Sequence, residues 1–81
     1  MAEGYEVGPG AVIAPGTVIG PGCVIEANAV LGKVPRLAGR RPRPLPPLVL
    51  GAGVTVCAGA VVYVGARIGD GAIIGDQAQV R

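Results

Sequence analysis

The sequence contains no histidine, tryptophan or phenylalanine, and its 81 residues include only two tyrosines and two cysteines. Without histidine, catalysis by a histidine base and metal sites built on histidine are excluded within these residues. A core must therefore be built from valine, isoleucine, leucine and alanine. Cys23 and Cys57 are too few for a disulfide framework, and neither belongs to a CxxC motif, which predicts two reduced thiols in a cytoplasmic protein.

Charge is also scarce, since charged residues make up 15% of the chain and hydrophobic residues 51%. This balance argues against disorder despite 15 glycines and 8 prolines, and no strict Gly-X-Y triplet indicates collagen. The first residues, MAEGYE, have two acids and no basic region, unlike a secretory signal. Residues 7–25 and 44–66 lack charge, but proline or glycine interrupts both, so we expect a soluble protein rather than a membrane-spanning one.

The most informative feature is a repeat of six residues. From Val7 the chain reads VGPGAV, IAPGTV, IGPGCV and IEANAV, and from Leu50 it reads LGAGVT, VCAGAV, VYVGAR, IGDGAI and IGDQAQ. The first position is always a large aliphatic residue, the fourth is glycine or an amide, and the fifth is small or β-branched. Agreement at three positions over nine complete sixes indicates a solenoid.

A period of six fits short strands joined by corners. Glycine or proline in every turn would break an α-helix, whereas side chains in a strand alternate between two faces. Ala11 and Ile13 should therefore point inward, with Val12 outward between them. The fourth position suits a corner, where glycine or asparagine adopts positive φ at little cost. Three sixes close one coil, which predicts a single all-β domain over residues 1–81, a parallel β-helix of about four coils.

The motif [LIV]-[GAED]-x-x-[STAV]-x, seen in IGPGCV, IEANAV and IGDGAI, resembles the hexapeptide repeat of left-handed β-helix acyltransferases. The resemblance implies a left-handed coil, an acyl-CoA co-substrate, a trimer, and a catalytic histidine in a cleft between subunits. No residue here can inherit the role of that histidine, so no catalytic residue is predicted in this chain. The same prism also carries γ-type carbonic anhydrases, whose three-histidine zinc site is excluded, and nucleotidyltransferase tails.

One insertion interrupts the repeat between Leu31 and Leu50. The simplest division leaves residues 33–45, KVPRLAGRRPRPL, as a protruding loop with five of the seven basic residues and no acid. A guanidinium fork matches phosphate, and projecting loops in the resembling family help to bind coenzyme A. We therefore expect acetyl-CoA or another acyl-CoA to be bound through Arg36, Arg40, Arg41 and Arg43.

Two alternatives to a phosphate-binding loop stay open. The loop could be a solvated basic segment that keeps an apolar solenoid soluble, or a proline-rich ligand of an SH3-like partner through RPRPLPP. Nucleic acid is not predicted as a partner, because the chain has no aromatic platform on which bases could stack.

The sixth position of each repeat should face outward, yet it is often valine. Sorting by coil places Val12, Val30 and Val61 on one outer face, an exposed apolar row that predicts contact with a neighbouring copy. The resemblance suggests a trimer, and an open end-to-end stack of coils is the alternative, because an uncapped coil leaves backbone groups unpaired.

The remaining polar candidates are interpreted as structural. Asp70 and Asp76 occupy the third position, where aspartate commonly serves as a turn residue, and Glu26 lies on an outer face. Cys23 points inward as a core residue, while Cys57 points outward but lacks a histidine partner. No metal ligand is predicted.

Two functions follow from different classes. The first is the N-terminal portion of a hexapeptide-repeat acyltransferase that acts on a sugar or another small amine or alcohol, with its catalytic histidine beyond Arg81. The second is a non-catalytic scaffold or self-assembly module. An ice-binding solenoid is a weaker third hypothesis, because the repeats contain only Thr17 and Thr55 as threonines.

Overall fold

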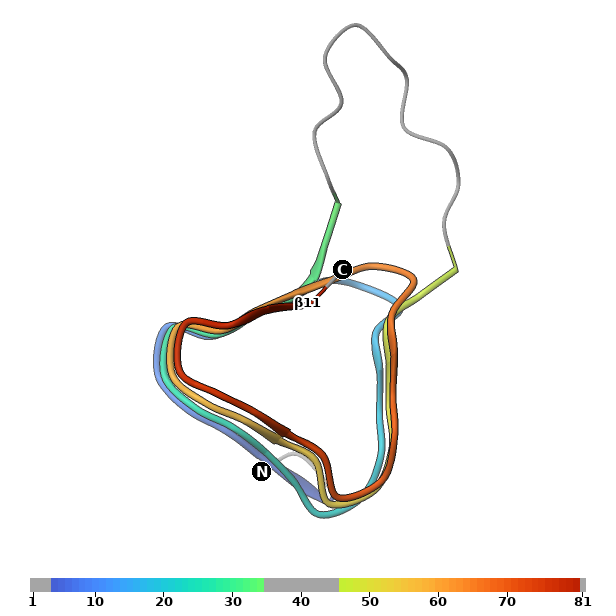
Figure 1. Cartoon of the computed structure of the whole chain (residues 1–81), viewed down its shortest axis with the longest axis horizontal. Coiled ribbons are helices and arrows are strands. Elements are labelled where there is room, and N and C mark those ends of the chain that lie inside the picture. The colour runs from blue at the N-terminus through green and yellow to red at the C-terminus, as the bar shows by residue number, and fades with distance from the viewer. Residues whose placement is uncertain (1–3, 35–45, 81) are drawn as a thin grey trace, which may run out of the picture.

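The computed structural model describes residues 4–34 and 46–80, which form short strands wound into stacked coils (Figure 1). The described residues contain no helix, so none of them forms a helix long and apolar enough to cross a membrane. The strands are β1 (Tyr5–Val7), β2 (Val12–Ile13), β3 (Val18–Ile19), β4 (Cys23–Ile25), β5 (Val30–Lys33), β6 (Val49–Leu50), β7 (Thr55–Val56), β8 (Val61–Tyr63), β9 (Arg67–Ile68), β10 (Ile73–Ile74) and β11 (Gln79–Val80).

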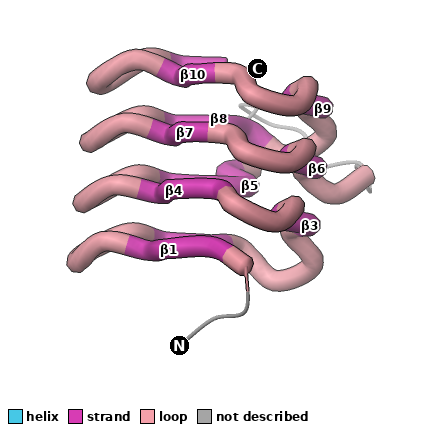
Figure 2. The backbone as a smooth tube through the Cα atoms, turned by 90° about the horizontal axis from the view of Figure 1, so that it is seen from below, coloured by secondary structure: helices cyan, strands magenta, loops and turns pink. Residues whose placement is uncertain are grey.

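Three parallel sheets form the sides of a triangular prism (Figures 1 and 2). Sheet A contains β1, β4, β7 and β10, sheet B contains β2, β5, β8 and β11, and sheet C contains β3, β6 and β9. Successive strands in the sequence always belong to different sheets, so each strand pairs with strands one coil away. The prediction of an all-β parallel β-helix is confirmed.

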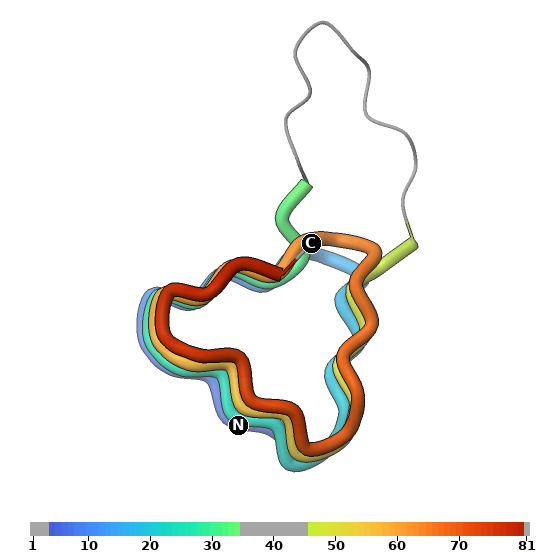
Figure 3. Tube along the Cα trace, in the orientation of Figure 1, coloured from blue at the N-terminus to red at the C-terminus, as the bar shows by residue number. Residues whose placement is uncertain are grey.

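The coil is left-handed, as the resemblance implied. In Figure 3 the chain circulates clockwise while it passes from the far coil, in blue, to the near coil, in red. A clockwise path that approaches the viewer is a left-handed helix. This hand is opposite to that of ordinary crossovers between parallel strands.

Strand register shows that the insertion leaves the coils in phase. Before the insertion Tyr5 pairs with Cys23, and after it Thr55 pairs with Ile73, in each case three sixes further along the chain. Val24 pairs with Thr55 across the insertion, and their greater separation in sequence is accounted for by the predicted loop, residues 33–45. The described residues on the two sides of the insertion therefore belong to coils that are in register.

The start of the insertion differs in detail from the predicted loop of residues 33–45. Lys33, its first predicted residue, is the last residue of β5 and pairs with Tyr63 after a register shift at Gly32. The Val64 N–H also donates to the Lys33 carbonyl oxygen at 2.9 Å. Residues 35–45 lie outside the described residues.

The fourth position of each six turns the corner with positive φ, including the two residues that are not glycine. Asn28 has φ 62° and Gln77 has φ 58°. Both are held by hydrogen bonds between coils, since Asn28 N–H donates to the Pro9 carbonyl and Gln77 N–H to the Ala58 carbonyl. These bonds hold conformations that cost most L-residues roughly 1–2 kcal/mol.

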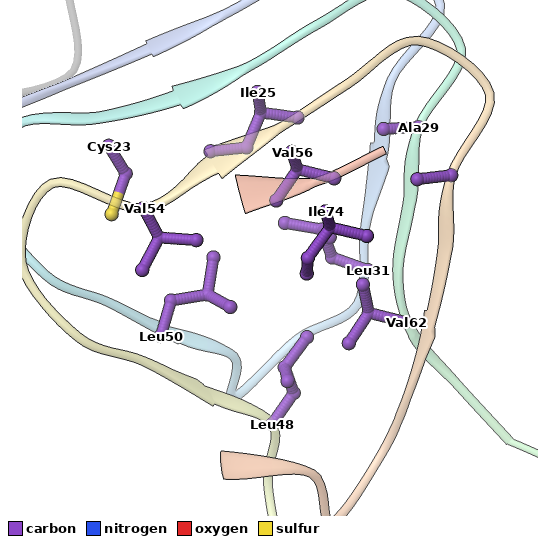
Figure 4. Close-up of a cluster of buried hydrophobic side chains, with 11 residues drawn as sticks. Cys23, Ile25, Ala29, Leu31, Leu48, Leu50, Val54, Val56, Val62 and Ile74 are labelled. Atoms are coloured by element: carbon purple, nitrogen blue, oxygen red, sulfur yellow. The ribbon is translucent and has the colours of Figure 1, made fainter. Parts of the chain in front are cut away.

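The core fills the prism with side chains from the first and fifth positions (Figure 4). It is best sealed in the middle coils, where Leu31, Val54 and Val62 are fully buried. Ala11 and Ile13 also pack against it but are only partly buried, because they lie in the first coil. The buried cluster consists of Cys23, Ile25, Ala29, Leu31, Leu48, Leu50, Val54, Val56, Ala60, Val62 and Ile74.

Close stacking at the corner between sheets C and A predicts very different effects for two glycine substitutions. A Cβ on Gly20 would lie 2.6 Å from the carbonyl carbon of Gly51, whereas a Cβ on Gly69 would meet nothing within 4 Å. Gly20→Ala should lower the free energy of unfolding by about 1–3 kcal/mol, because backbone must shift. Gly69→Ala should leave it unchanged or raise it by up to about 1 kcal/mol.

Urea unfolding followed by circular dichroism measures both glycine variants. Equal losses of stability in Gly20→Ala and Gly69→Ala would contradict the close backbone approach at Gly20.

Candidate functional site

The predicted interface residues share one outer face, here named the valine face and defined as Val12, Val30 and Val61. Val12 pairs with Val30, and Val30 pairs with Val61, across three coils of sheet B. Val12 is 57% exposed, and the other two are half-buried. The six-residue period therefore placed these residues correctly, while their contact with another copy remains a prediction.

Exposed apolar side chains also occur on the other two faces. Val18 in sheet C is 50% exposed, and Ile73 in sheet A is 74% exposed. Each of these faces also carries a charged residue, because Val49 pairs with Arg67 in sheet C and Val24 pairs with Glu6 in sheet A. The row of the valine face continues to Gln79, which pairs with Val61, so among the described residues this row has one polar residue and no charged one.

The predicted phosphate-binding residues Arg36, Arg40, Arg41 and Arg43 lie outside the described residues. On the N-terminal side of the insertion, the Lys33 ammonium lies 5.7 Å from the centre of the Tyr63 ring. Attraction between a cation and an aromatic face at this distance contributes about 0.5–1 kcal/mol at exposed sites. This contact adds to the backbone pairing that fixes the point where the chain leaves sheet B.

A group that the sequence analysis did not bring together lies at the corner between sheets A and B. Glu26 follows β4, Cys57 follows β7 and Asp76 follows β10, and these strands lie above one another (Figure 2). The Glu26 and Asp76 carboxylate oxygens and the Cys57 sulfur all lie within 4.8 Å of one another. We call these three residues the thiol corner.

The backbone at the thiol corner is fixed by hydrogen bonds between coils. Glu26 N–H donates to the Val56 carbonyl and Cys57 N–H to the Ile74 carbonyl, each at 2.9 Å. The Ala58 N–H also donates to Oε1 of Glu26 at 3.1 Å, which orients this exposed carboxylate toward the next coil. The three donor groups are therefore brought together by the fold rather than by proximity in sequence.

The electrostatic environment of the thiol corner is acidic. Partial burial raises the pKa of the Cys57 thiol, and the nearby carboxylates of Glu26 and Asp76 raise it further. The cationic side chains of the described residues lie elsewhere, Lys33 at the other end of sheet B and Arg67 on sheet C. The thiol is thus held protonated, which makes it a weak nucleophile.

The other polar candidates have structural roles in the described residues. Oδ1 of Asp70 accepts a hydrogen bond from Ala52 N–H at 2.8 Å, as expected of a residue that supports a corner. The Cys23 thiol is 1% exposed and donates to the Gly51 carbonyl at 3.1 Å, which confirms the core assignment of this cysteine. Asp76 differs, because the stacking of coils places it beside another acid and a thiol.

The family described as bacterial transferase hexapeptide (six repeats) matches residues 1–33. No curated protein and no solved structure matches the chain. Residues 1–33 are therefore similar to a family of hexapeptide-repeat transferases, and the left-handed coils agree with that similarity. The same repeat continues after the insertion, since residues 50–80 form coils in register with the earlier ones.

The raised pKa predicts slow alkylation of Cys57. In the folded protein, the pH profile of its reaction with iodoacetamide should give a pKa above that of an ordinary cysteine thiol, while Cys23 stays unmodified. Glu26→Gln or Asp76→Asn should lower this pKa and speed alkylation at pH 8, because each removes a negative charge that opposes the thiolate.

Mass spectrometry of the two cysteine-containing peptides measures these rates. The matched control is Asp70→Asn, an acid at a different corner, which should leave the rate for Cys57 unchanged. Identical profiles in wild type, Glu26→Gln and Asp76→Asn would contradict the electrostatic influence of the two carboxylates.

Proposed function

We propose that this β-helix is part of an acyltransferase that moves an acyl group from a coenzyme A thioester to a hydroxyl or amine of a sugar or another small molecule. The observation that carries the proposal is the match of residues 1–33 to the bacterial transferase hexapeptide family, supported by the left-handed coils. One fold can host several activities, so it is the transferase family match, and not the β-helix itself, that points to group transfer.

Acyl transfer requires a general base that removes a proton from the attacking hydroxyl or amine. The 81 residues include no histidine, and the thiol at Cys57 is held protonated between two acids. In this proposal the chain binds and positions the co-substrate, the base is supplied by residues outside these 81, and the isolated chain is inactive.

Coenzyme A binding is assigned to the basic insertion on sequence grounds. Each planar guanidinium group can donate two hydrogen bonds to the oxygens of one phosphate. The insertion holds five of the seven basic residues of the chain. Two described residues flank the insertion at the corner between sheets B and C: Val34 follows β5, and Pro46 precedes β6. The residues assigned to bind are Arg36, Arg40, Arg41 and Arg43.

The oligomer proposed is a homotrimer in which the valine face packs against a neighbouring copy. Burial of apolar surface contributes about 25 cal/mol per Å², and Val12 is more than half exposed in the single chain. Assembly would thus remove from water the three aligned valines of this face.

A non-catalytic scaffold is the second candidate function. The observation that favours it is that Val12, Val18 and Ile73 expose apolar side chains on all three faces, which suits an assembly with several contacts. A scaffold would not bind coenzyme A, so a binding measurement separates the two candidates.

The oligomer is tested by placing one charge on the valine face. Val30→Lys should weaken association by about 2 kcal/mol or more, because an unpaired ammonium would be buried at the contact. Val24→Lys is the matched control, since Val24 is outward-facing and half-buried in the same coil but belongs to sheet A beside Glu6.

Sedimentation equilibrium measures the masses of both lysine variants and of the wild type. The expected result is a trimeric wild type and Val24→Lys variant, with Val30→Lys dissociating at higher concentration. A monomeric wild type, or equal dissociation of both variants, would contradict the assignment of the interface.

Co-substrate binding is tested by calorimetric titration of the folded chain with acetyl-CoA at low and moderate salt. We expect saturable heat whose affinity falls with salt, because phosphate contacts are ionic. Replacing Arg40, Arg41 and Arg43 together by alanine should weaken binding at least about tenfold. The control Arg67→Ala removes a cation from sheet C and should leave affinity unchanged.

Absence of heat from folded wild type would overturn the coenzyme A assignment and favour the scaffold. Heat that survives the triple substitution would place the co-substrate elsewhere on the chain.

A further inference from the structure

The thiol corner combines two kinds of metal ligand on a fixed frame. Within the described residues it is the one group in which three acidic or thiol side chains have ligand atoms so close together. The two carboxylates come from different coils: Glu26 lies in the coil before that of Cys57, and Asp76 lies in the coil after it. The thiol therefore lies between two oxygen donors rather than beside an ordinary acidic surface.

The distances suit a small cation. Zinc bound at about 2.3 Å from sulfur and about 2.0–2.2 Å from oxygen separates neighbouring ligand atoms by roughly 3.5 Å. The three donors lie within 4.8 Å of one another, so rotations of exposed side chains can close the site while the hydrogen-bonded backbone stays in place. Glu26 keeps its second oxygen for the metal, because Oε1 accepts the Ala58 N–H.

Charge also favours a cation. Two carboxylates and a thiol converge where the described residues place no cationic side chain. A divalent ion would bring two positive charges to the corner and replace the thiol proton, which leaves to solvent as the sulfur–metal bond forms. The resulting site has three protein ligands and net charge −1, with a fourth position for water.

We infer that Glu26, Cys57 and Asp76 bind one divalent transition-metal ion, of the zinc class, through one thiolate and two carboxylates. The thiolate selects this class over magnesium and calcium, which prefer oxygen ligands alone. The inference does not depend on acyl transfer, since it uses a corner of the prism different from the one that carries the basic insertion.

The test uses cobalt(II) as a visible substitute for zinc, added without oxygen to the whole folded chain. A near-ultraviolet charge-transfer band should appear, since only a thiolate bound to cobalt produces it, and zinc should displace it. Glu26→Gln and Asp76→Asn should each weaken cobalt binding at least about tenfold, by analogy with losses seen when groups supporting a metal are removed. Cys57→Ala should abolish the band.

Asp70→Asn is the matched control, because it removes an acid from a corner that has no thiol at its outer surface, and it should bind cobalt as the wild type does. Circular dichroism verifies that each variant is folded. A second measurement needs no variant: zinc should protect Cys57 of the wild type from alkylation, whereas magnesium should not.

The inference is overturned if folded wild type gives no charge-transfer band, or if the band persists in Cys57→Ala. Equal cobalt affinity in wild type, Glu26→Gln and Asp76→Asn would also overturn it, as would failure of zinc to protect Cys57. None of these results bears on acetyl-CoA binding, so the two proposals fail independently.

Discussion

Hydrogen bonding between successive coils is the constraint on which the rest of this structure depends. The strands are so short that none can be stable alone, and the backbone groups of each are satisfied one coil away. In-register stacking then forces every side chain to lie beside its equivalent in the next coil. The preference for small residues at corners follows, as at Gly20, whose missing side chain leaves space for the backbone of Gly51.

The same constraint explains how the chain tolerates an insertion rich in proline and arginine. An insertion at a corner does not change which backbone groups face each other, provided that the chain returns in phase. Val49 and Leu50 re-enter sheet C opposite Val18 and Ile19, so the core continues without a break. A solenoid can therefore carry a chemically different segment at its edge while its stability stays in the coils.

Stacking also creates chemistry that the individual repeats do not contain. A single carboxylate at a corner is an ordinary solvated group, as Asp70 shows by bonding to a backbone N–H. Glu26, Cys57 and Asp76 are each equally ordinary in their own repeats, but coil spacing brings their donor atoms within 4.8 Å. Repetition of backbone geometry thus converts three separate surface residues into a potential ligand set.

The sequence by itself determined the repeat, the inward and outward positions and the valine face, because a strict period of six residues maps directly onto a strand and a corner. It also located the insertion, although the end of β5 at Lys33 required the observed pairing with Tyr63. Hand was implied by family resemblance, since periodicity is the same for either hand. The same period aligns Glu26 with Cys57, which hold the second position of repeats one coil apart, but Asp76 holds the third position of its repeat. Only the tertiary structure decided that the three donor atoms converge within 4.8 Å, because the period fixes the position of a residue in its coil and not the direction of its side chain at a corner.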